Sequence, residues 1–249
     1  RAAAWANPAD ALVYLALAEA WVKAGRSAAA VRLVEIADVL GPLRSPALAR
    51  SAEFWLGQER PDRALARWRM LLRTRPETAA PLFPLLLRLA ENPATQPLLQ
   101  PLLADPPEWW DRFFAYAAAQ ATRPETVVFL YQSRHRRGAL PAADEQRAYL
   151  ERLWKENRWL DAYLAWLNGL DERQIRALGN VHNGGFEAPV THLGFDWRLS
   201  ALRGTMVEII ETYGARGDKA LHVSFNGERV HFQHVSQYLF LEAGRYQLQ

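Results

Sequence analysis

The sharpest cluster of like charge in the chain is a short basic run, Arg134, His135, Arg136, Arg137 and Gly138. Three guanidinium groups this close together are suited to hold an anion, because the planar arginine fork matches carboxylate and phosphate oxygens. An acidic polysaccharide or a phosphorylated lipid carrier has that chemistry. The alternative is a solvated helix end, where basic residues complement the helix dipole and glycine caps the C-terminus. We favour the helix end and keep Arg134, Arg136 and Arg137 as candidate ligand-binding residues.

A second candidate is aromatic. Trp197 is the one tryptophan of the last 70 residues, and Phe195 and Tyr213 lie near it in sequence. Together they would form a platform for a sugar ring, whose C–H groups stack on the π-face. The alternative is that Phe195 and Trp197, two residues apart on one strand face, are core. We favour core and keep Trp197 as the candidate sugar-binding residue.

Five histidines lie between His182 and His234, which suggests a metal site. His231 and His234 are three residues apart, however, so a strand would send them to opposite faces and prevent chelation of one ion. His222 and His231 flank a turn at Asn226 and are expected to pair across it. The sequence contains no nucleophile elbow, zinc helix, phosphate loop or dinucleotide fingerprint. We therefore expect a protein that is not an enzyme and needs no cofactor.

The composition is that of an ordinary globular chain. Its 249 residues are 50% hydrophobic and 23% charged, with a net charge of +3 and no cysteine. Such balanced charge argues against nucleic acid as a partner, and no run of 18 apolar residues is present to span a membrane. The absence of an initiating Met indicates an excised or processed fragment. Nine of ten Trp precede Val181 whereas five of six His follow it, so we predict two domains, residues 1–179 and 180–249.

The first domain is predicted to be a helical repeat. Small and aromatic residues recur at a 34-residue interval, the period of a two-helix repeat in which alanines allow close helix approach. Asn7 with Pro8, and Ser45 with Pro46, are typical helix starts. The recurring positions are Ala18 and Ala52, Trp21 and Trp55, Ala30 and Ala64, and Pro42 and Pro76.

The second copy, with Ala52, Trp55, Ala64, Trp68 and Pro76, resembles the tetratricopeptide repeat. That family pairs a small residue and an aromatic on its first helix with an alanine on its second. The first copy departs from it, because Val34 stands where the second has Trp68. The resemblance implies an α-α superhelix that binds a protein partner.

Beyond Pro76 the spacing weakens, but the helical pattern continues to about residue 178. Trp110, Phe113 and Phe114 share one helical face and are predicted to be core, with Trp109 exposed. The helices expected in this stretch cover residues 77–89, 95–103, 107–121, 125–135, 142–157, 159–169 and 171–178.

After Asn180 the pattern alternates as in strands. Asn226 and Gly227 between two alternating runs predict a two-residue hairpin. The six expected strands cover residues 195–202, 206–212, 221–225, 230–232, 235–241 and 246–248.

The run Asn183, Gly184, Gly185, Phe186 and Glu187, followed by segments around residues 217–223 and 235–246, resembles a galactose-binding-like jelly roll. It is similar to carbohydrate-binding modules of families four and nine. Such sandwiches have about eight strands, so this one is expected to be incomplete, with an unpaired edge. We therefore expect the sheet either to pack on the helices around Trp159 and Trp166 or to pair with a second copy of the chain.

In the modules that this run resembles, the Glu of the opening motif often helps to hold a structural calcium ion. The resemblance gives that role to Glu187, with Asp218 as an associate. The alternative, which we favour, is a hydrogen bond from Glu187 to a neighbouring turn.

The overall expectation is an α+β multidomain protein: a tetratricopeptide-like α-helical solenoid followed by an incomplete antiparallel β-sandwich. The two resemblances together imply a non-enzymatic scaffold of a bacterial envelope or exopolysaccharide system, with a protein partner on the solenoid and a periplasmic or envelope-associated location. The alternative is a carbohydrate-binding protein that uses the C-terminal β-sandwich, with polysaccharide as its ligand.

Overall fold

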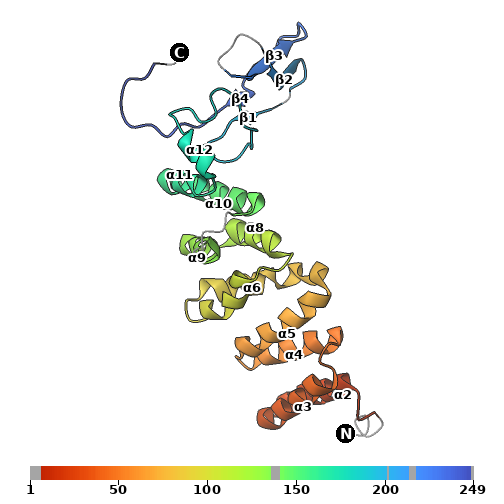
Figure 1. The fold of residues 1–249 in the computed structure, drawn as a ribbon. Helices are drawn as coiled ribbons and strands as arrows, with labels where there is room; N and C mark the ends of the chain where they lie inside the picture. Colours follow the sequence, from red (N-terminus) through yellow and green to blue (C-terminus); the bar gives the residue numbers. More distant parts are fainter. Residues whose placement is uncertain (1–6, 136–140, 201, 213–216, 248–249) are drawn as a thin grey trace. The chain divides into compact units, whose positions relative to one another are not determined.

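The computed structural model describes residues 7–135, 141–200, 202–212 and 217–247. Within them the chain is α+β, with a helical N-terminal region and a few antiparallel strands near the C-terminus (Figure 1). It divides into two compact units, Arg1–Arg134 and His135–Gln249. The second unit therefore holds the last helices as well as the strands, and the compositional change near residue 179 falls inside it.

The first unit opens with two helical pairs at a constant step. Helices α2 and α4 begin at residues 11 and 45, and α3 and α5 begin at residues 27 and 61, so each step is 34 residues. Gly25 makes the first tight turn with φ +73°. Figure 1 shows the two pairs as successive layers. The four helices are α2 (Ala11–Lys23), α3 (Ser27–Leu40), α4 (Ser45–Gly57) and α5 (Pro61–Thr74).

The positions that recur in the sequence form the core of these two pairs. The four alanines Ala18, Ala30, Ala52 and Ala64 are each 0% exposed. Trp55 fills the space beside them and is 1% exposed. The prediction that small residues allow close helix approach is therefore confirmed at these positions.

Ion pairs join the second helix of one pair to the second helix of the next. On α5, Arg63 Nη1 lies 3.0 Å from Glu35 Oε1, and Arg67 Nη2 lies 2.6 Å from Asp38 Oδ2. The other oxygen of Asp38 accepts a hydrogen bond from Ser51 Oγ at 2.7 Å. These contacts fix the register of α5 against α3.

Prolines change the helices expected over residues 77–89 and 95–103. Since proline cannot donate the helical backbone hydrogen bond, the first stretch forms two 3₁₀ turns before α6, and the second forms a 3₁₀ turn before a short α7. Further along, α8 and α9 follow the expected ranges. The elements are η1 (Pro76–Thr78), η2 (Ala80–Leu82), α6 (Phe83–Glu91), η3 (Gln96–Leu99), α7 (Gln100–Ala104), α8 (Trp110–Gln120) and α9 (Pro124–His135).

An aromatic cluster forms the core of this second half of the first unit. Phe83 lies 5.6 Å from Phe113 and 6.1 Å from Trp109 between ring centroids. The expectation that Trp109 is exposed is wrong, because this residue is 1% exposed. It precedes α8, so its side chain is not bound by the helical face that Trp110 and Phe113 share, and its ring turns back onto Phe83.

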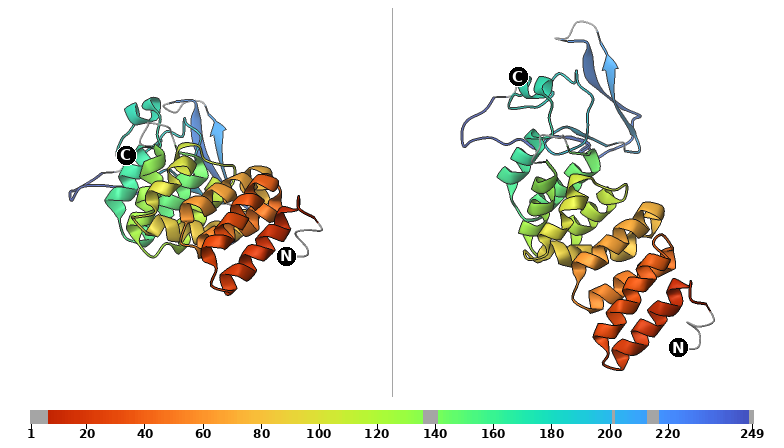
Figure 2. Two further views of the ribbon diagram at one scale, coloured as in Figure 1. Left: turned by 90° about the horizontal axis from the view of Figure 1, so that it is seen from below. Right: turned by 60° about the horizontal axis from the view of Figure 1, so that its bottom comes forward.

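The second unit begins with three helices and ends with short strands. Asp171 and Gln174 form a capping box at the start of its last helix. Figure 2 shows the chain after β4 as an extended segment. The elements are α10 (Ala143–Lys155), α11 (Trp159–Leu167), α12 (Glu172–Arg176), β1 (Arg198–Leu199), β2 (Thr205–Glu211), β3 (Lys219–Phe225) and β4 (Val235–Ser236).

The strands pair differently from the expectation. Strand β3 runs antiparallel to β2, from Thr205 opposite Phe225 to Glu211 opposite Lys219. The predicted hairpin at Asn226 is wrong, because the residues after that turn form no strand and β4 pairs with β1. His222 consequently lies opposite Glu208, not His231. The described residues thus hold two two-stranded sheets in place of the expected six-stranded arrangement, and Leu248 lies outside them.

Contact between the last helices and the chain that follows them is present in the second unit. The Phe195 ring centroid lies 5.6 Å from that of Trp166 and 5.0 Å from that of Tyr163. Phe240 stacks on Tyr163 at 4.9 Å. The expected packing on Trp166 is confirmed, although it is made by residues outside β2 and β3. Trp159 is exposed and takes no part in it.

Candidate functional site

The glycine-rich run after the helices folds into a closed loop, residues 183–188. The Asn183 amide donates to the Ala188 carbonyl at 2.9 Å and accepts from the Ala188 amide at 3.1 Å. Asn183 and Phe186 have φ of 50° and 58°, a left-handed conformation that asparagine tolerates better than most residues. The loop presents Phe186 on one side and Glu187 at its end.

Glu187 holds the start of β3. Its Oε1 accepts the backbone amides of Asp218 at 3.0 Å and Lys219 at 3.2 Å, and Lys219 Nζ donates to the Glu187 carbonyl at 3.3 Å. Gly217 has φ +108°, and a Cβ there would overlap the Glu187 carboxylate. The two candidate metal residues are thus brought together, but it is the backbone of Asp218 that meets Glu187. A hydrogen bond from Glu187 to a turn was the alternative that we favoured.

In the described ranges of the chain, no three histidine or acidic side chains converge as a metal site would require. Calcium binding by Glu187 and Asp218 stays a prediction, which calcium titration can test.

Trp197 is half-buried and belongs to the same loop. Its Nε1 donates to the Asn183 carbonyl at 3.0 Å, and its ring lies 5.0 Å from that of Phe186. Phe195 points elsewhere, into the aromatic core beside Trp166. The strand rule that put Phe195 and Trp197 on one face does not apply, because β1 begins only at Arg198. A shared platform of these two rings is therefore wrong, and Tyr213 lies outside the described residues.

The basic run is only partly described. Arg134 lies near the end of α9, with its guanidinium carbon 5.8 Å from the ring centroid of Trp110. Arg136 and Arg137 lie outside the described residues. The contact with Trp110 is a cation–π arrangement at the long end of its range. Anion binding by the three arginines stays a prediction.

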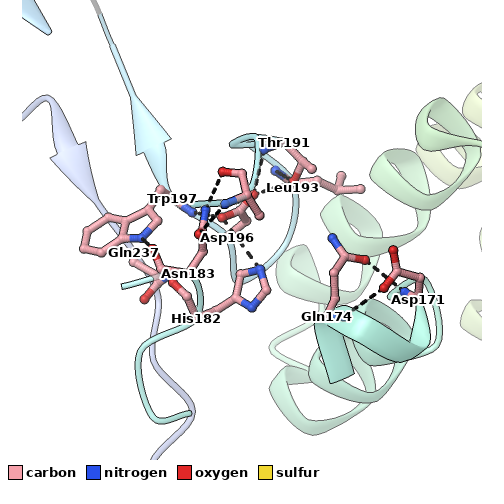
Figure 3. Close-up of polar contacts among 10 residues, drawn as sticks. Asp171, Gln174, His182, Asn183, Thr191, Leu193, Asp196, Trp197 and Gln237 are labelled. Atoms are coloured by element: carbon pink, nitrogen blue, oxygen red, sulfur yellow. Dashed lines mark hydrogen bonds and ion pairs between the residues drawn. The ribbon is translucent and has the colours of Figure 1, made fainter. Parts of the chain in front are cut away.

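The sequence gave no warning of a buried histidine–carboxylate pair. His182 is 8% exposed, and its Nε2 lies 4.0 Å from Asp196 Oδ1. Asp196 also accepts the Thr191 amide and hydroxyl at 2.6 and 2.7 Å and the Trp197 amide at 2.7 Å. Figure 3 shows these groups around the carboxylate. The hydrogen bonds compensate for the burial of Asp196.

Burial lowers the pKa of His182 from 6.5, and the Asp196 charge opposes that change. The imidazole is therefore neutral at pH 7. Its ring stands edge-on to Trp166, with 5.0 Å between centroids. Gly194 permits this packing, because its φ is +59° and a Cβ there would overlap the Trp166 ring.

A small cavity of about 50 Å³ lies beside His182. Gln237 enters it, and its Nε2 donates to the His182 carbonyl at 2.8 Å. Within the described part of the chain, His182 Nδ1 and Gln237 Oε1 are buried and have no hydrogen-bond partner. The volume suits ordered water, which would satisfy both atoms, and is well below that of ligand pockets. Its other lining residues are Tyr163, Trp166, Leu178, Gly179, Asn180, Phe195, Tyr238, Leu239 and Phe240.

The first unit carries an exposed aliphatic stripe on α3 and the turn that follows it. We define the α3 stripe as Ile36, Val39, Leu40 and Leu43, which are between 39% and 78% exposed. Their spacing places them along one helical face. Val34 and Ala37, on the other face of the same helix, are buried in the core. Aliphatic side chains aligned in this way are typical of a protein-interaction surface.

Comparison with known proteins adds no family. No family model matches the chain, and no curated protein matches it. Among the helices that the structure describes, none has the length and apolar character needed to cross a lipid bilayer. The evidence for a function is therefore the repeat geometry, the α3 stripe and the loop contacts above.

Proposed function

We propose that the chain is a non-enzymatic protein-interaction scaffold, and that its first unit binds the apolar helical face of a partner protein along the α3 stripe. The observation that carries the proposal is the exposure of four aligned aliphatic residues on a helix whose other face is fully packed. Val39 alone is 78% exposed. Because burial of apolar surface is the main driving force for association, a complementary apolar helix is the partner that this surface fits best.

In this proposal the first unit is a tetratricopeptide-like solenoid. Support comes from the 34-residue step of the first two pairs and from the fully buried alanines at Ala30 and Ala64. The ion pairs Arg63–Glu35 and Arg67–Asp38 link successive pairs, as expected where each repeat contacts its neighbour. Repeats of this kind carry binding surfaces rather than catalytic groups.

The C-terminal strands would belong to an incomplete jelly roll, and the context would be a bacterial envelope or exopolysaccharide system. Both ideas rest on the sequence resemblance of the Asn183–Glu187 run. The closed loop that this run forms, and its hydrogen bonds to the start of β3, are compatible with a motif that organises the sheet. The loop therefore supports a structural role for the motif.

Carbohydrate binding by the C-terminal part ranks second. Its aromatic candidate, Trp197, uses its N–H on the Asn183 carbonyl and packs its ring near Phe186. Phe195 is buried in the core. Since a sugar-binding platform needs an open aromatic face, the geometry favours the scaffold.

The proposal can be tested by crosslinking through the α3 stripe. A photoreactive residue at position 39, in an extract of the source organism, should crosslink to a defined protein. Val39→Asp with Leu43→Asp should abolish co-purification of that protein, whereas Ala28→Asp, at an exposed position elsewhere on α3, should leave it intact. Equal recovery with all variants would exclude the stripe as the binding surface.

A further inference from the structure

A groove in the first unit lies between the C-terminal half of α5 and the segment that connects α7 to α8. Its volume is about 320 Å³, at the lower end of the range for binding pockets. It is separate from the α3 stripe, and nothing in the proposed scaffold function requires it to bind a ligand. The lining residues are Arg69, Leu72, Arg73, Leu102, Asp105, Pro106, Pro107 and Trp109.

Two arginines give the groove its charge. Arg69 and Arg73 are four residues apart on α5, so both guanidinium groups project from one face. Neither forms an ion pair or a side-chain hydrogen bond with any residue in the described ranges. Other arginines of this region behave differently: Arg44, Arg50, Arg60, Arg63 and Arg67 each pair with an acidic residue.

The local structure does not explain this pair of charges. Like charges four residues apart destabilise a helix slightly. The helix dipole favours Arg73, which lies in the last turn of α5, but it does not reach Arg69 one turn earlier. Two adjacent guanidinium groups without acidic partners, beside a cavity, are suited to take one carboxylate through forked hydrogen bonds.

A buried donor in the groove wall points to the same ligand chemistry. Trp109 is 1% exposed, and its indole Nε1 is buried without a hydrogen-bond partner among the described residues. An unsatisfied buried N–H is costly. An acceptor oxygen that enters the groove would satisfy it and would lie beside the arginines.

The remaining lining residues limit the kind of anion. Leu72, Leu102 and Pro107 supply apolar walls, so the ligand should carry an apolar group next to its charge. Asp105 adds one negative charge, which disfavours a dianion such as a phosphate group. Trp109 is too deeply buried to offer a face to a sugar ring, which disfavours an acidic polysaccharide.

We propose that this groove binds an acidic peptide segment, with the carboxylate of an Asp or Glu on Arg69 and Arg73 and a neighbouring apolar side chain against Leu72 and Leu102. The indole N–H of Trp109 donates to an oxygen of the same segment. The ligand is a peptide rather than a polysaccharide because the groove offers apolar walls and guanidinium groups but no exposed aromatic face.

The test uses the full chain and two blocked peptides of seven residues that differ at one position. One peptide has a Leu-Glu centre and the other a Leu-Gln centre, and binding is measured by calorimetry at low salt. We expect the Glu peptide to bind about tenfold more tightly, because charge-assisted hydrogen bonds are stronger than neutral ones. The affinity should fall as salt is added, because salt screens exposed charges.

The controls separate the groove from general positive charge. Arg69→Gln with Arg73→Gln should remove the preference for Glu, whereas Arg26→Gln with Arg32→Gln, which removes the same charge from exposed positions near and on α3, should keep it. Arg69→Lys with Arg73→Lys should give an intermediate affinity, because lysine keeps the charge without the fork. Circular dichroism melting checks that each variant is folded.

Three results would overturn the proposal. The first is equal affinity for the Glu and Gln peptides, or no binding of either. The second is an equal loss with both pairs of Gln variants. The third is binding of oligogalacturonate, an acidic sugar polymer, in place of the peptides. None of these outcomes bears on the α3 stripe, whose crosslinked partner is scored separately.

Discussion

Asp10 and Arg44 lie 34 residues apart in sequence, and their side chains form an ion pair with Oδ1 and Nη1 at 2.7 Å. Each is the N-cap residue of the first helix in its pair. Asp10 also accepts the Leu12 amide at 3.0 Å. Equivalent positions of two successive repeats thus carry opposite charges and bind each other, so the repeat period itself sets the contact.

This relationship can be measured with a double-mutant cycle of Asp10→Asn and Arg44→Gln. The pair is partly exposed, so the coupling free energy should be about 0.2–1 kcal/mol at low ionic strength. It should decrease in high salt, because salt screens exposed charges. A coupling free energy of zero at low salt would show that the two side chains do not interact in solution.

Ala64→Trp should destabilise the first unit by about 1–3 kcal/mol, because a large side chain overpacks a site that is now 0% exposed. Ala66→Trp is the matched control on the exposed side of the same helix and should change little. Chemical denaturation of both variants measures the difference. Equal stability of the two variants would remove the assignment of Ala64 to the closest helix approach.

The helical pairs could be predicted from sequence because their signals are local. Alanines at a 34-residue step, with caps and prolines at the ends, define a helix and its buried face together. Where prolines lie inside a run, as at Pro81 and Pro84 or at Pro97 and Pro101, the same pattern gives 3₁₀ turns or a short helix. A periodic pattern does not show which backbone donors are missing.

Strand pairing was less predictable because it depends on distant residues. A turn does form at Asn226, where Oδ1 accepts the Glu228 amide at 3.0 Å. The run after it pairs with nothing, since β3 finds its partner in β2. The local signal therefore gave the turn correctly but not the strand partner.

The candidate site shows the same limit. The contacts of Glu187 and Trp197 lie within one motif or reach β3, and the motif drew attention to both residues. His182 and Asp196 have no such signal, because their juxtaposition depends on the path of the loop between them and on the space beside Trp166. Only Gly194, with φ +59° against that tryptophan, hints at close packing.

Gly194→Ala should destabilise the second unit by about 1–3 kcal/mol, because the new Cβ overlaps the Trp166 ring. Gly227→Ala is the matched control, since Gly227 also has positive φ, +92°, but has no atom within 4 Å of the added Cβ. The difference between the two variants isolates packing from backbone strain. Thermal melting followed by tryptophan fluorescence measures it, and equal melting temperatures would contradict the Gly194–Trp166 contact.

The structural-calcium prediction is tested by melting the protein in chelator and in millimolar calcium. If Glu187 and Asp218 bind the ion, calcium raises the melting temperature by mass action on the folded state. Because Glu187 Oε1 already accepts two backbone amides, we expect equal melting temperatures. Glu187→Ala should then cost about 0.5–1.5 kcal/mol through lost hydrogen bonds alone. A rise in melting temperature with calcium that Glu187→Ala abolishes would instead establish the metal site.

His182 should make the stability of the second unit depend on pH. Burial lowers its pKa in the folded chain below the unfolded value of 6.5, against the opposing charge of Asp196. Between the two pKa values the unfolded chain binds a proton that the folded chain does not, so the free energy of unfolding increases with pH across that interval. The contribution is complete above pH 6.5 and falls progressively as the pH drops toward the folded pKa.

Replacement of the imidazole isolates this effect from other titrating groups. His182→Gln should lose less stability than the parent chain between pH 7.5 and pH 5, while His231→Gln, an exposed histidine of the same unit, should behave like the parent. Denaturant midpoints at each pH give the comparison. Proton NMR of the parent chain provides a check that needs no variant: the His182 ring signals should titrate below pH 6.5. Titration at or above that value would show that Asp196, rather than burial, dominates.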